Sequence, residues 1–244
     1  MPIRLPLLPA DPNGAFPPAG QALREPNGLL AMGGDLSAPR LLNAYRHGIF
    51  PWYSEGEPIL WWCPDPRMVF DTASFRLPSR FRRWLRRSAW QVNADGAFAA
   101  VIDACARSPR PGQDGTWITR DMRSAYLALH RQGHAHSIEV HDGPRLVGGI
   151  YGVAVGRMFF GESMFSAEPG GSKVALAALA RHLARHGWPL IDAQVENPHL
   201  VSLGGRRLAR PEFLARVAQL AAEPVAPGSW AGTLPAFAAS ELSA

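Results

Sequence analysis

The stretch that decides the fold spans residues 135–166 and reads AHSIEVHDGPRLVGGIYGVAVGRMFFGESMFS. It contains three runs rich in β-branched and aromatic residues, at 135–140, 145–155 and 157–166, which predict three β-strands. The gaps between these runs hold Asp142-Gly143 and Gly156, and short gaps of this kind predict hairpin turns. We therefore expect three consecutive antiparallel strands.

Helical periodicity surrounds this stretch on both sides. In the segment that Thr119 caps, for example, Met122, Tyr126 and Leu129 fall on one face and Gly133 ends the helix. The expected helices are residues 37–47 (capped by Ser37), 79–87, 95–106, 119–132, 172–186, 199–203 and 211–220. One further strand is expected at 189–195, with Pro/Gly-rich loops at 108–115 and beyond residue 223.

The order helix, three antiparallel strands, helix, strand and helix resembles that of acetyltransferase-like (GNAT) domains. We therefore expect an α+β fold with a central, mostly antiparallel sheet that is flanked by helices and opens to hold an acyl donor. Residues 1–35 are rich in Pro and Gly, and residues 49–67 are rich in aromatic residues and turns. We expect a small N-terminal domain, 1–67, ahead of a GNAT-like catalytic domain, 68–244.

The composition is that of a globular protein and leans toward a polyanionic partner. The chain is 47% hydrophobic with a formal net charge of +5, and Lys173 is the only lysine among its 25 Lys and Arg residues. Arginine binds phosphate through paired hydrogen bonds and stacks on bases, which favours a nucleic acid as partner. A genome of high GC content would also favour Arg over Lys.

Other classes of protein are disfavoured by the sequence. Cys63 and Cys105 form no CxxC pair, and the HxxxH residues His182 and His186 have no third ligand nearby in sequence. No apolar run of about 18 residues occurs, so we expect no membrane-spanning segment, and no signal peptide is recognised. We expect a cytoplasmic monomer that needs neither a metal nor a cofactor.

Polar residues in the segment 190–194, which reads LIDAQ, indicate a candidate site. If this segment is a strand, Asp192 and Gln194 point to the same face, because side chains alternate. A carboxylate on an otherwise apolar strand needs a reason, since burying it unpaired is costly. Either these two residues line a cleft for a polar substrate, or Asp192 caps a neighbouring helix or binds an arginine.

Residues 158–166 read MFFGESMFS and place one carboxylate among Met and Phe. A regular strand would put Met158, Phe160, Glu162, Met164 and Ser166 on one face. Such a face suits an apolar pocket with one charged anchor, in which methionine adapts to Leu, Phe or Met side chains. The alternative is an ordinary core strand with Glu162 at its edge.

Two segments are candidates for phosphate contacts. The loop 165–173 opens a helix whose free N–H groups would bind an anion, although Ser172 is equally well placed as a simple cap. The RxxGxG/A pattern with which acetyltransferases hold coenzyme A is missing there. The basic helix at 79–87 would dock through Phe81, Trp84 and Leu85 and expose its arginines to phosphates, or only to solvent. These arginines are Arg80, Arg82, Arg83, Arg86 and Arg87.

A set of motifs in a fixed order makes this chain resemble the leucyl/phenylalanyl-tRNA–protein transferases. The motifs are EPNGLLAMGGDL at 25–36, AYRHGIFPW at 44–52, WWCPDPR at 61–67, TWIT at 116–119, GHAHSIE at 133–139, GESMFS at 161–166 and LID at 190–192. The resemblance implies a small N-terminal domain on a GNAT-like domain, with the active site between them.

The resemblance also implies a reaction and its partners. The donor is an aminoacyl-tRNA charged with Leu or Phe, and also Met, and the acceptor is a protein that starts with Arg or Lys. The product enters the bacterial N-degron route to proteolysis. By position in the motifs, Tyr45, Trp52 and Trp117 shape the site around the tRNA 3′-adenosine and the acceptor. By the same match, Met164 lines the donor pocket and Glu162, Asp192 and Gln194 form the polar centre. From the residues themselves, we also expect Phe160 and Ser166 to contact the substrate, and Lys173 and the five arginines to contact the tRNA.

Three positions depart from the usual pattern of that family. Ala193 stands where relatives often have Cys, Cys63 where they often have Ser, and Gly171 where they usually have Ala. We expect Gly171 to loosen the start of its helix by roughly 0.5–1 kcal/mol.

The implied reaction is aminolysis of an ester that is already activated, so it requires neither ATP nor a metal. An α-amine has a pKa of about 8 and is partly neutral at pH 7, so positioning can supply much of the acceleration. Asp192 and Gln194 would hold the amine, with Asp192 either a general base or an anchor. Two other functions stay open: an acetyl-CoA-dependent N-acetyltransferase, and a tRNA-binding protein without catalysis.

Overall fold

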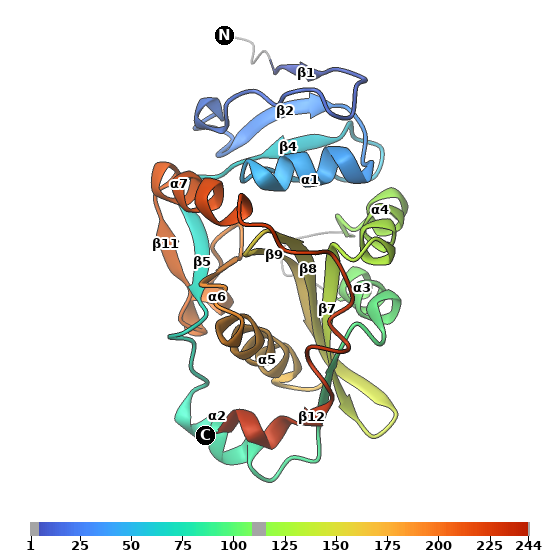
Figure 1. Cartoon of the computed structure of the whole chain (residues 1–244), viewed down its shortest axis with the longest axis vertical. Coiled ribbons are helices and arrows are strands. Elements are labelled where there is room, and N and C mark those ends of the chain that lie inside the picture. Colours follow the sequence, from blue (N-terminus) through green and yellow to red (C-terminus); the bar gives the residue numbers. More distant parts are fainter. Residues whose placement is uncertain (1–4, 109–115, 244) are drawn as a thin grey trace.

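Two β-sheets and their surrounding helices make up the computed structural model, which describes residues 5–108 and 116–243 (Figure 1). The strands follow the order β1-β2-β4-β3 in the first sheet and β11-β5-β10-β9-β8-β7-β6-β12 in the second. The loop expected at 108–115 lies, from residue 109 onward, outside the described residues.

The first sheet is built from strands that precede residue 67. Its strands are β1 (Leu7–Leu8), β2 (Leu29–Gly33), β3 (Phe50–Pro51) and β4 (Leu60–Trp62). A 3-10 turn (Ala19–Gln21) precedes β2, and helix α1 (Ala38–Arg46) lies between this sheet and the second one (Figure 1). Ser37 holds the N-cap position of α1, but its side chain makes no capping hydrogen bond, so that detail of the prediction is wrong.

The second sheet has the three expected antiparallel strands at its centre. They are β7 (Ala135–Asp142), β8 (Arg145–Val155) and β9 (Met158–Ser166). Around them lie β5 (Arg67–Asp71), β6 (Gln91–Ala94), β10 (Leu190–Asp192), β11 (Arg206–Leu208) and β12 (Phe237–Ala238). Strand β10 runs parallel to β9 and pairs only with the first three residues of β9. The two strands therefore part beyond Phe160, and the sheet opens there.

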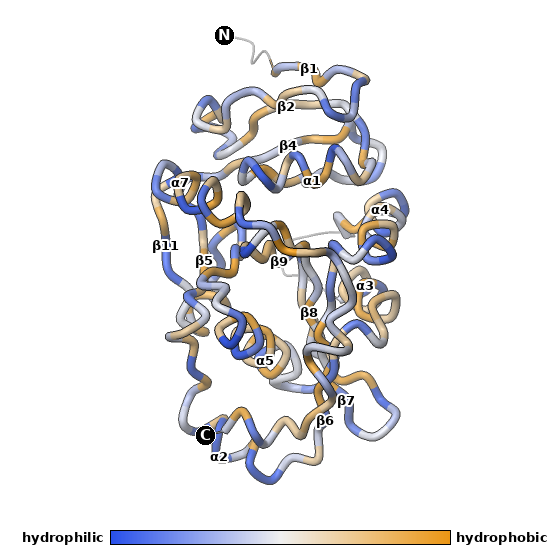
Figure 2. The backbone as a smooth tube through the Cα atoms, viewed as in Figure 1, coloured by the Kyte–Doolittle hydropathy of each residue, from blue (hydrophilic) through white to orange (hydrophobic). Residues whose placement is uncertain are grey.

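Helices cover both faces of the second sheet, which gives the expected α+β architecture. Figure 1 shows α5 (Gly171–Arg185) on one face and α3 (Phe98–Arg107) with α4 (Arg120–Arg131) on the other. Buried side chains form one core with α1, α3 and α4 and a second core with α5. The hydrophobic colour along α5 and β8 in Figure 2 marks where these layers meet.

Three shorter or peripheral helices complete the chain: α2 (Ser79–Leu85), α6 (Pro198–Ser202) and α7 (Arg210–Ala221). Helix α4 begins as expected, because the Thr119 hydroxyl accepts a hydrogen bond from the Met122 N–H at 3.2 Å. Helix α3 begins at Phe98, later than expected, because Asp95 adopts a left-handed φ of 58°.

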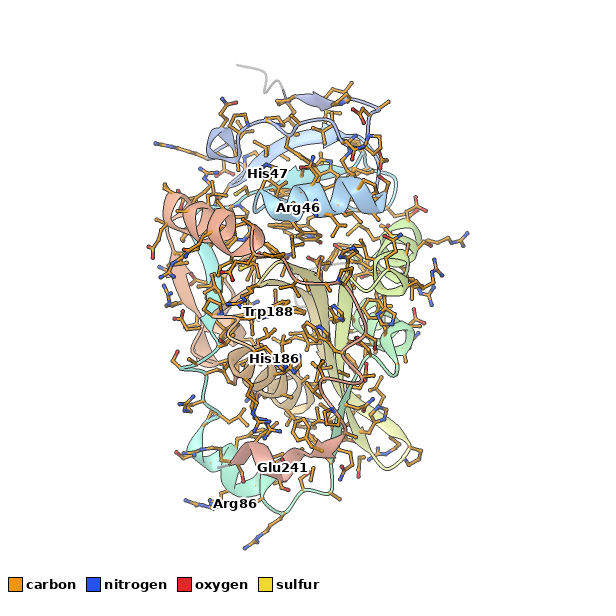
Figure 3. The ribbon with its side chains drawn as sticks, in the orientation of Figure 1. Arg46, His47, Arg86, His186, Trp188 and Glu241 are labelled. Carbon is orange, nitrogen blue, oxygen red and sulfur yellow. The ribbon has the colours of Figure 1, made fainter. Side chains whose placement is uncertain are left out.

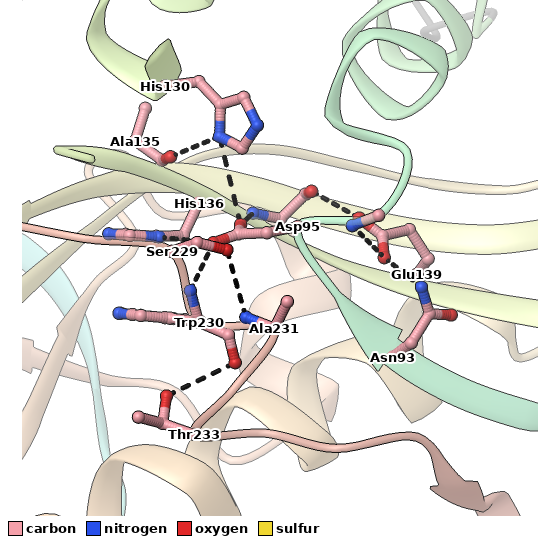
Figure 4. A network of polar contacts seen from close by, with 12 residues as sticks. Asn93, Asp95, His130, Ala135, His136, Glu139, Ser229, Trp230, Ala231 and Thr233 are labelled. Atoms are coloured by element: carbon pink, nitrogen blue, oxygen red, sulfur yellow. Dashed lines mark hydrogen bonds and ion pairs between the residues drawn. The ribbon is translucent and has the colours of Figure 1, made fainter. Parts of the chain in front are cut away.

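The segment beyond residue 223 is irregular as far as residue 236, as expected, and then joins the second sheet. Strand β12 pairs with β6, and a final 3-10 helix (Ala239–Ser243) follows it. Figure 4 shows the fastening: the Asp95 carboxylate accepts hydrogen bonds from the Trp230 N–H at 2.7 Å and from His136 Nδ1 at 2.9 Å. The His136 ring also stacks on the Trp230 indole with centroids 4.0 Å apart. This tail therefore closes one edge of the sheet.

Candidate active site

A cavity of about 810 Å³ opens where β9 and β10 part. Its walls come from β9, from the chain that follows β10, from the start of α5 and from aromatic residues that precede the second sheet. The lining includes Phe50, Trp52, Trp117, Ile150, Glu162, Met164, Ser166, Ser172, Leu176, Ile191, Asp192, Gln194 and His199. Apolar side chains dominate this lining, and a few polar groups converge at one wall, as expected of a ligand site.

Most of the predicted substrate and catalytic residues meet at this cavity. Trp52 and Trp117, Met164 and Ser166, and the polar residues Glu162, Asp192 and Gln194 all line it. Tyr45 and Phe160 do not; both are fully buried behind the wall, with their rings 5.1 Å apart. Any effect of these two residues on a ligand is therefore transmitted through the residues in front of them.

Strand β9 carries a bulge that changes which side chains share a face. Tyr151 of β8 lies opposite Ser163, whereas Gly152 lies opposite Gly161, so Glu162 is an extra residue without a partner across the ladder. Met158 and Phe160 consequently pack into the core beside α3 and α4, while Met164 packs against the core beside α5. The prediction of one continuous face from Met158 to Ser166 is wrong.

The β10 strand is also shorter than expected. It ends at Asp192, and Gln194 adopts a left-handed φ of 59°, so simple alternation does not bring the two residues together. They meet through a tight turn in which the Asp192 Oδ1 atom accepts a hydrogen bond from the Gln194 N–H at 2.9 Å. The Gln194 Nε2 atom then donates to Glu162 Oε1 at 2.8 Å. The polar centre is thus a connected chain of hydrogen bonds.

Two tyrosine hydroxyls support Glu162 from behind. The Tyr45 hydroxyl lies 2.8 Å from Oε1 and the Tyr126 hydroxyl lies 2.6 Å from Oε2, both within hydrogen-bond distance. Burial raises the pKa of Glu162 to about 7, even though the hydrogen bonds from Tyr126 and Tyr45 lower it. The sequence placed Tyr126 only on the apolar face of its helix. Its buried hydroxyl, which needs a polar partner, was the signal for a further role.

Asp192 forms a fully buried ion pair, which is one of the alternatives that the sequence left open. Arg67 donates from Nε and Nη2 to the two carboxylate oxygens at 2.8 and 2.7 Å, and both side chains have no exposed surface. Arg67 Nη1 also donates to the Gly48 carbonyl at 3.0 Å, and its guanidinium lies between the rings of Phe50 and Phe213. Sequence reasoning missed Arg67, although it closes the motif at 61–67.

The basic helix α2 lies beside the start of α5, which forms part of the cavity wall. Lys173 Nζ is 5.7 Å from the centroid of the Phe81 ring, and a Cβ atom at Gly170 would be 2.4 Å from that ring. Four of the five predicted arginines, Arg80, Arg83, Arg86 and Arg87, are exposed, whereas Arg82 is partly buried. Figure 3 labels Arg86 at the lower end of the molecule.

The docking of α2 differs in one respect from the prediction. Leu85 is fully buried, but Trp84 is 45% exposed and lies against the rings of Phe81 and Trp90.

The start of α5 also differs from the prediction. Ser172 is not the cap of α5, because Gly170 holds that position with a φ of 98°. The Ser172 N–H instead donates to the Ser166 hydroxyl at 2.9 Å, which joins α5 to the end of β9.

Within the described residues, no group of three or more His, Cys, Asp or Glu side chains is arranged to hold a metal ion. In the same part of the chain, every helix is too short or too polar to cross a membrane. Cys63 and Cys105 are both buried.

The family models and the sequence relatives agree on one family. The family model described as leucyl/phenylalanyl-tRNA protein transferase matches residues 69–218, and the model of its N-terminal domain matches residues 34–65. A leucyl/phenylalanyl-tRNA–protein transferase of Xanthomonas axonopodis pv. citri is 68% identical over 97% of this chain and 95% of its own length. That of Xanthomonas oryzae pv. oryzae is 69% identical over 99% and 97%. A crystal structure of FemX shares 12% identity over 74% of this chain and 71% of that one, with a TM-score of 0.45. The chain belongs to the leucyl/phenylalanyl-tRNA–protein transferase family and is an aminoacyltransferase.

Proposed function

We propose that the cavity between β9 and β10 holds the aminoacyl end of Leu-tRNA or Phe-tRNA, and that the amino acid passes to a protein starting with Arg or Lys. The observation that carries this proposal is the cavity itself, in which an apolar wall meets one connected polar centre. The apolar wall suits a Leu or Phe side chain, and the polar centre suits the two groups that react.

In the proposed reaction, the acceptor α-amine attacks the ester carbonyl of the donor. A C–N bond forms, the C–O bond to the tRNA 3′-oxygen breaks, and one amine proton is lost while that oxygen gains one. The side-chain amide of Gln194 donates an N–H to Glu162. The Oε1 atom of Gln194 is therefore the acceptor that we propose for the N–H of the amine. Because both Asp192 oxygens accept hydrogen bonds from Arg67, we assign Asp192 to holding Gln194 in place.

We propose that Met164, Ile150 and Leu176 contact the donor side chain, with Trp52 and Trp117 beside the 3′-adenosine and the acceptor. These residues line one continuous cavity. Discrimination by methylene-sized differences in an apolar pocket is limited to about 10–200-fold. Met-tRNA is therefore expected as a further donor, while side chains branched at Cβ are expected to fit less well.

The tRNA itself is proposed to lie across α2 and the start of α5. Exposed Arg80, Arg83, Arg86 and Arg87 supply charge for phosphates, together with Lys173 and the partly buried Arg82. The exposed Trp84 ring offers a surface on which an unpaired base can stack. Because the proposed substrates are charged tRNA and cellular proteins, we propose a cytoplasmic location. We also propose that the products enter the N-degron route.

Transfer of labelled amino acid from purified Leu-, Phe-, Met- and Val-tRNA to a peptide starting with Arg tests the proposal. Matched peptides start with Lys, with Ala, or with an acetylated Arg. We expect transfer from Leu-, Phe- and Met-tRNA to the Arg and Lys peptides, and little from Val-tRNA. Acetylation of the same peptides by acetyl-CoA without transfer from tRNA would overturn the proposal. Tight binding of charged tRNA without any transfer would overturn it as well.

A further inference from the structure

Three oxygen-bearing side chains meet in a closed triangle behind the cavity. The hydroxyl oxygens of Tyr45 and Tyr126 are 2.6 Å apart, and each also lies within hydrogen-bond distance of Glu162, at 2.8 and 2.6 Å. Both tyrosines have no exposed surface, and Glu162 is 7% exposed. All three contacts have the O···O lengths of real hydrogen bonds, so each requires a hydrogen atom between its two oxygens.

The number of hydrogens decides the protonation state of this triangle. Each tyrosine hydroxyl supplies one, and an ionised carboxylate supplies none, which leaves three contacts with two hydrogens. We propose that Glu162 is a neutral carboxylic acid in the resting enzyme, held by a closed ring of three hydrogen bonds with Tyr45 and Tyr126. The third hydrogen is then the carboxylic proton of Glu162.

The direction of the ring follows from the other bond that Glu162 makes. Oε1 also accepts a hydrogen bond from Gln194 Nε2 at 2.8 Å, so it is the oxygen with two incoming donors and has carbonyl character. The proton therefore sits on Oε2. In sequence around the ring, Glu162 donates to Tyr126, Tyr126 donates to Tyr45, and Tyr45 donates back to Oε1.

The charges around the triangle also favour the neutral form. Arg67 is the cation whose charge lowers the pKa of Glu162, but its guanidinium is already engaged by both oxygens of Asp192. The Asp192 carboxylate itself raises the pKa of Glu162, and burial raises it more. On the other side of the triangle, the phenol ring of Tyr151 on β8 packs edge-on to Tyr126, with centroids 5.6 Å apart.

A neutral Glu162 has a specific use if the cavity binds the acceptor as proposed above, and this step rests on that proposed function. A carboxylate beside the acceptor would stabilise its ammonium form, which has no lone pair for attack. The neutral acid avoids that effect, yet its carbonyl oxygen still fixes the amide of Gln194. Tyr45 and Tyr126 are thus positioning residues that keep Glu162 uncharged.

Infrared difference spectroscopy of the full-length protein tests the protonation state without any substrate. The wild-type minus Glu162→Gln spectrum at pH 6 is expected to contain the C=O band of a carboxylic acid, which disappears by pH 9. The same difference spectrum for Glu55→Gln, which changes an exposed glutamate, serves as the control. Absence of the acid band at pH 6 overturns the proposal.

A second variant covers the case in which Glu162→Gln fails to fold. Glu139 is the other glutamate whose pKa burial raises to about 7. An acid band at pH 6 that survives Glu139→Gln then has to come from Glu162, and loss of the whole band in Glu139→Gln overturns the proposal. These spectra are independent of tRNA, so they stand even if the transfer assay fails.

Activity gives a separate measure of the role. Glutamine can replace the neutral acid in the ring, because its N–H can donate to Tyr126 while its carbonyl accepts from Tyr45 and Gln194. We expect the kcat of Glu162→Gln to be at least tenfold above that of Glu162→Ala. A kcat for Glu162→Gln equal to or below that of Glu162→Ala would mean that an ionised carboxylate is needed, and the proposal would be wrong.

Discussion

Replacing Arg67 by methionine should destabilise the protein strongly, because it leaves a carboxylate buried without its cation. Arg67 gives Asp192 two hydrogen bonds of 2.8 and 2.7 Å, and neither side chain has any exposed surface. The same substitution removes the bond to the Gly48 carbonyl at 3.0 Å, which ties β5 to the end of α1. Methionine fills a similar volume between Phe50 and Phe213, so the loss is mainly electrostatic.

Breaking a buried ion pair on one side typically costs about 3–5 kcal/mol. For a protein of this size, 1 kcal/mol moves the melting temperature by roughly 2–4 °C, so Arg67→Met should lower it by roughly 6–20 °C. The measurement is thermal unfolding followed by circular dichroism, with calorimetry for the enthalpy. A loss below about 1 kcal/mol would refute the assignment of Arg67 and Asp192 as a buried charged pair.

The double variant Arg67→Met/Asp192→Leu distinguishes the cost of an unpaired buried charge from the role of Asp192 in activity. With both charges removed, stability should recover toward wild type, because apolar residues often replace a buried ion pair at little cost. Activity should not recover, since leucine cannot hold the Gln194 N–H. If the double variant instead loses as much stability as the two single variants added together, Arg67 and Asp192 do not interact directly.

Three further predictions concern the bulge, the tRNA surface and pH. Gly152→Ala should cost about 1–3 kcal/mol in urea unfolding, because a Cβ there would lie 2.2 Å from the Phe160 carbonyl oxygen; full stability would contradict this close approach. Arg83→Gln should reduce the slope of log KM for Leu-tRNA against log salt by about 0.7–0.9, whereas exposed Arg216→Gln on α7 should leave it unchanged. The pKa of Glu162 is raised to about 7 in the folded protein, so the folded state holds this proton more tightly than the unfolded state. Glu162 should then contribute a fall of roughly 3 kcal/mol in the free energy of unfolding as pH rises from about 4.5 to 7. Glu162→Gln should remove that share and leave the share of Glu139, whose pKa is also raised to about 7.

The fold was largely predictable from the sequence because its signals are local. The hairpin turns at 142–143 and 156, the Thr119 cap and the periodicity of α4 each act over a few residues, and all of them are confirmed. Strand β10 was overestimated because apolar and polar residues alternate from Ile191 to Val195, as they do in a strand. The turn that ends the strand depends on a hydrogen bond to the Asp192 side chain.

The partners of the polar centre were beyond local reasoning. Tyr45 and Glu162 are 117 residues apart, and Arg67 and Asp192 are 125 apart, so no spacing rule connects them. Sequence did indicate that a carboxylate at 192 needs a partner, and binding to an arginine was one of its alternatives. With 24 arginines to choose from, given that Lys173 is the only lysine among 25 cations, the sequence offered no way to choose Arg67.

The bulge at Glu162 shows why strand alternation failed where the site lies. A regular β9 would direct Glu162 and Met164 to the same side, so the carboxylate and the methionine would lie in the same core. The extra residue sends Glu162 toward Tyr45 and Tyr126, and Met164 toward α5. The parting of β9 from β10 after Phe160 then exposes both to one cavity. A single inserted residue thereby separates the apolar surface that we propose for the donor side chain from the polar groups that we propose for the amine.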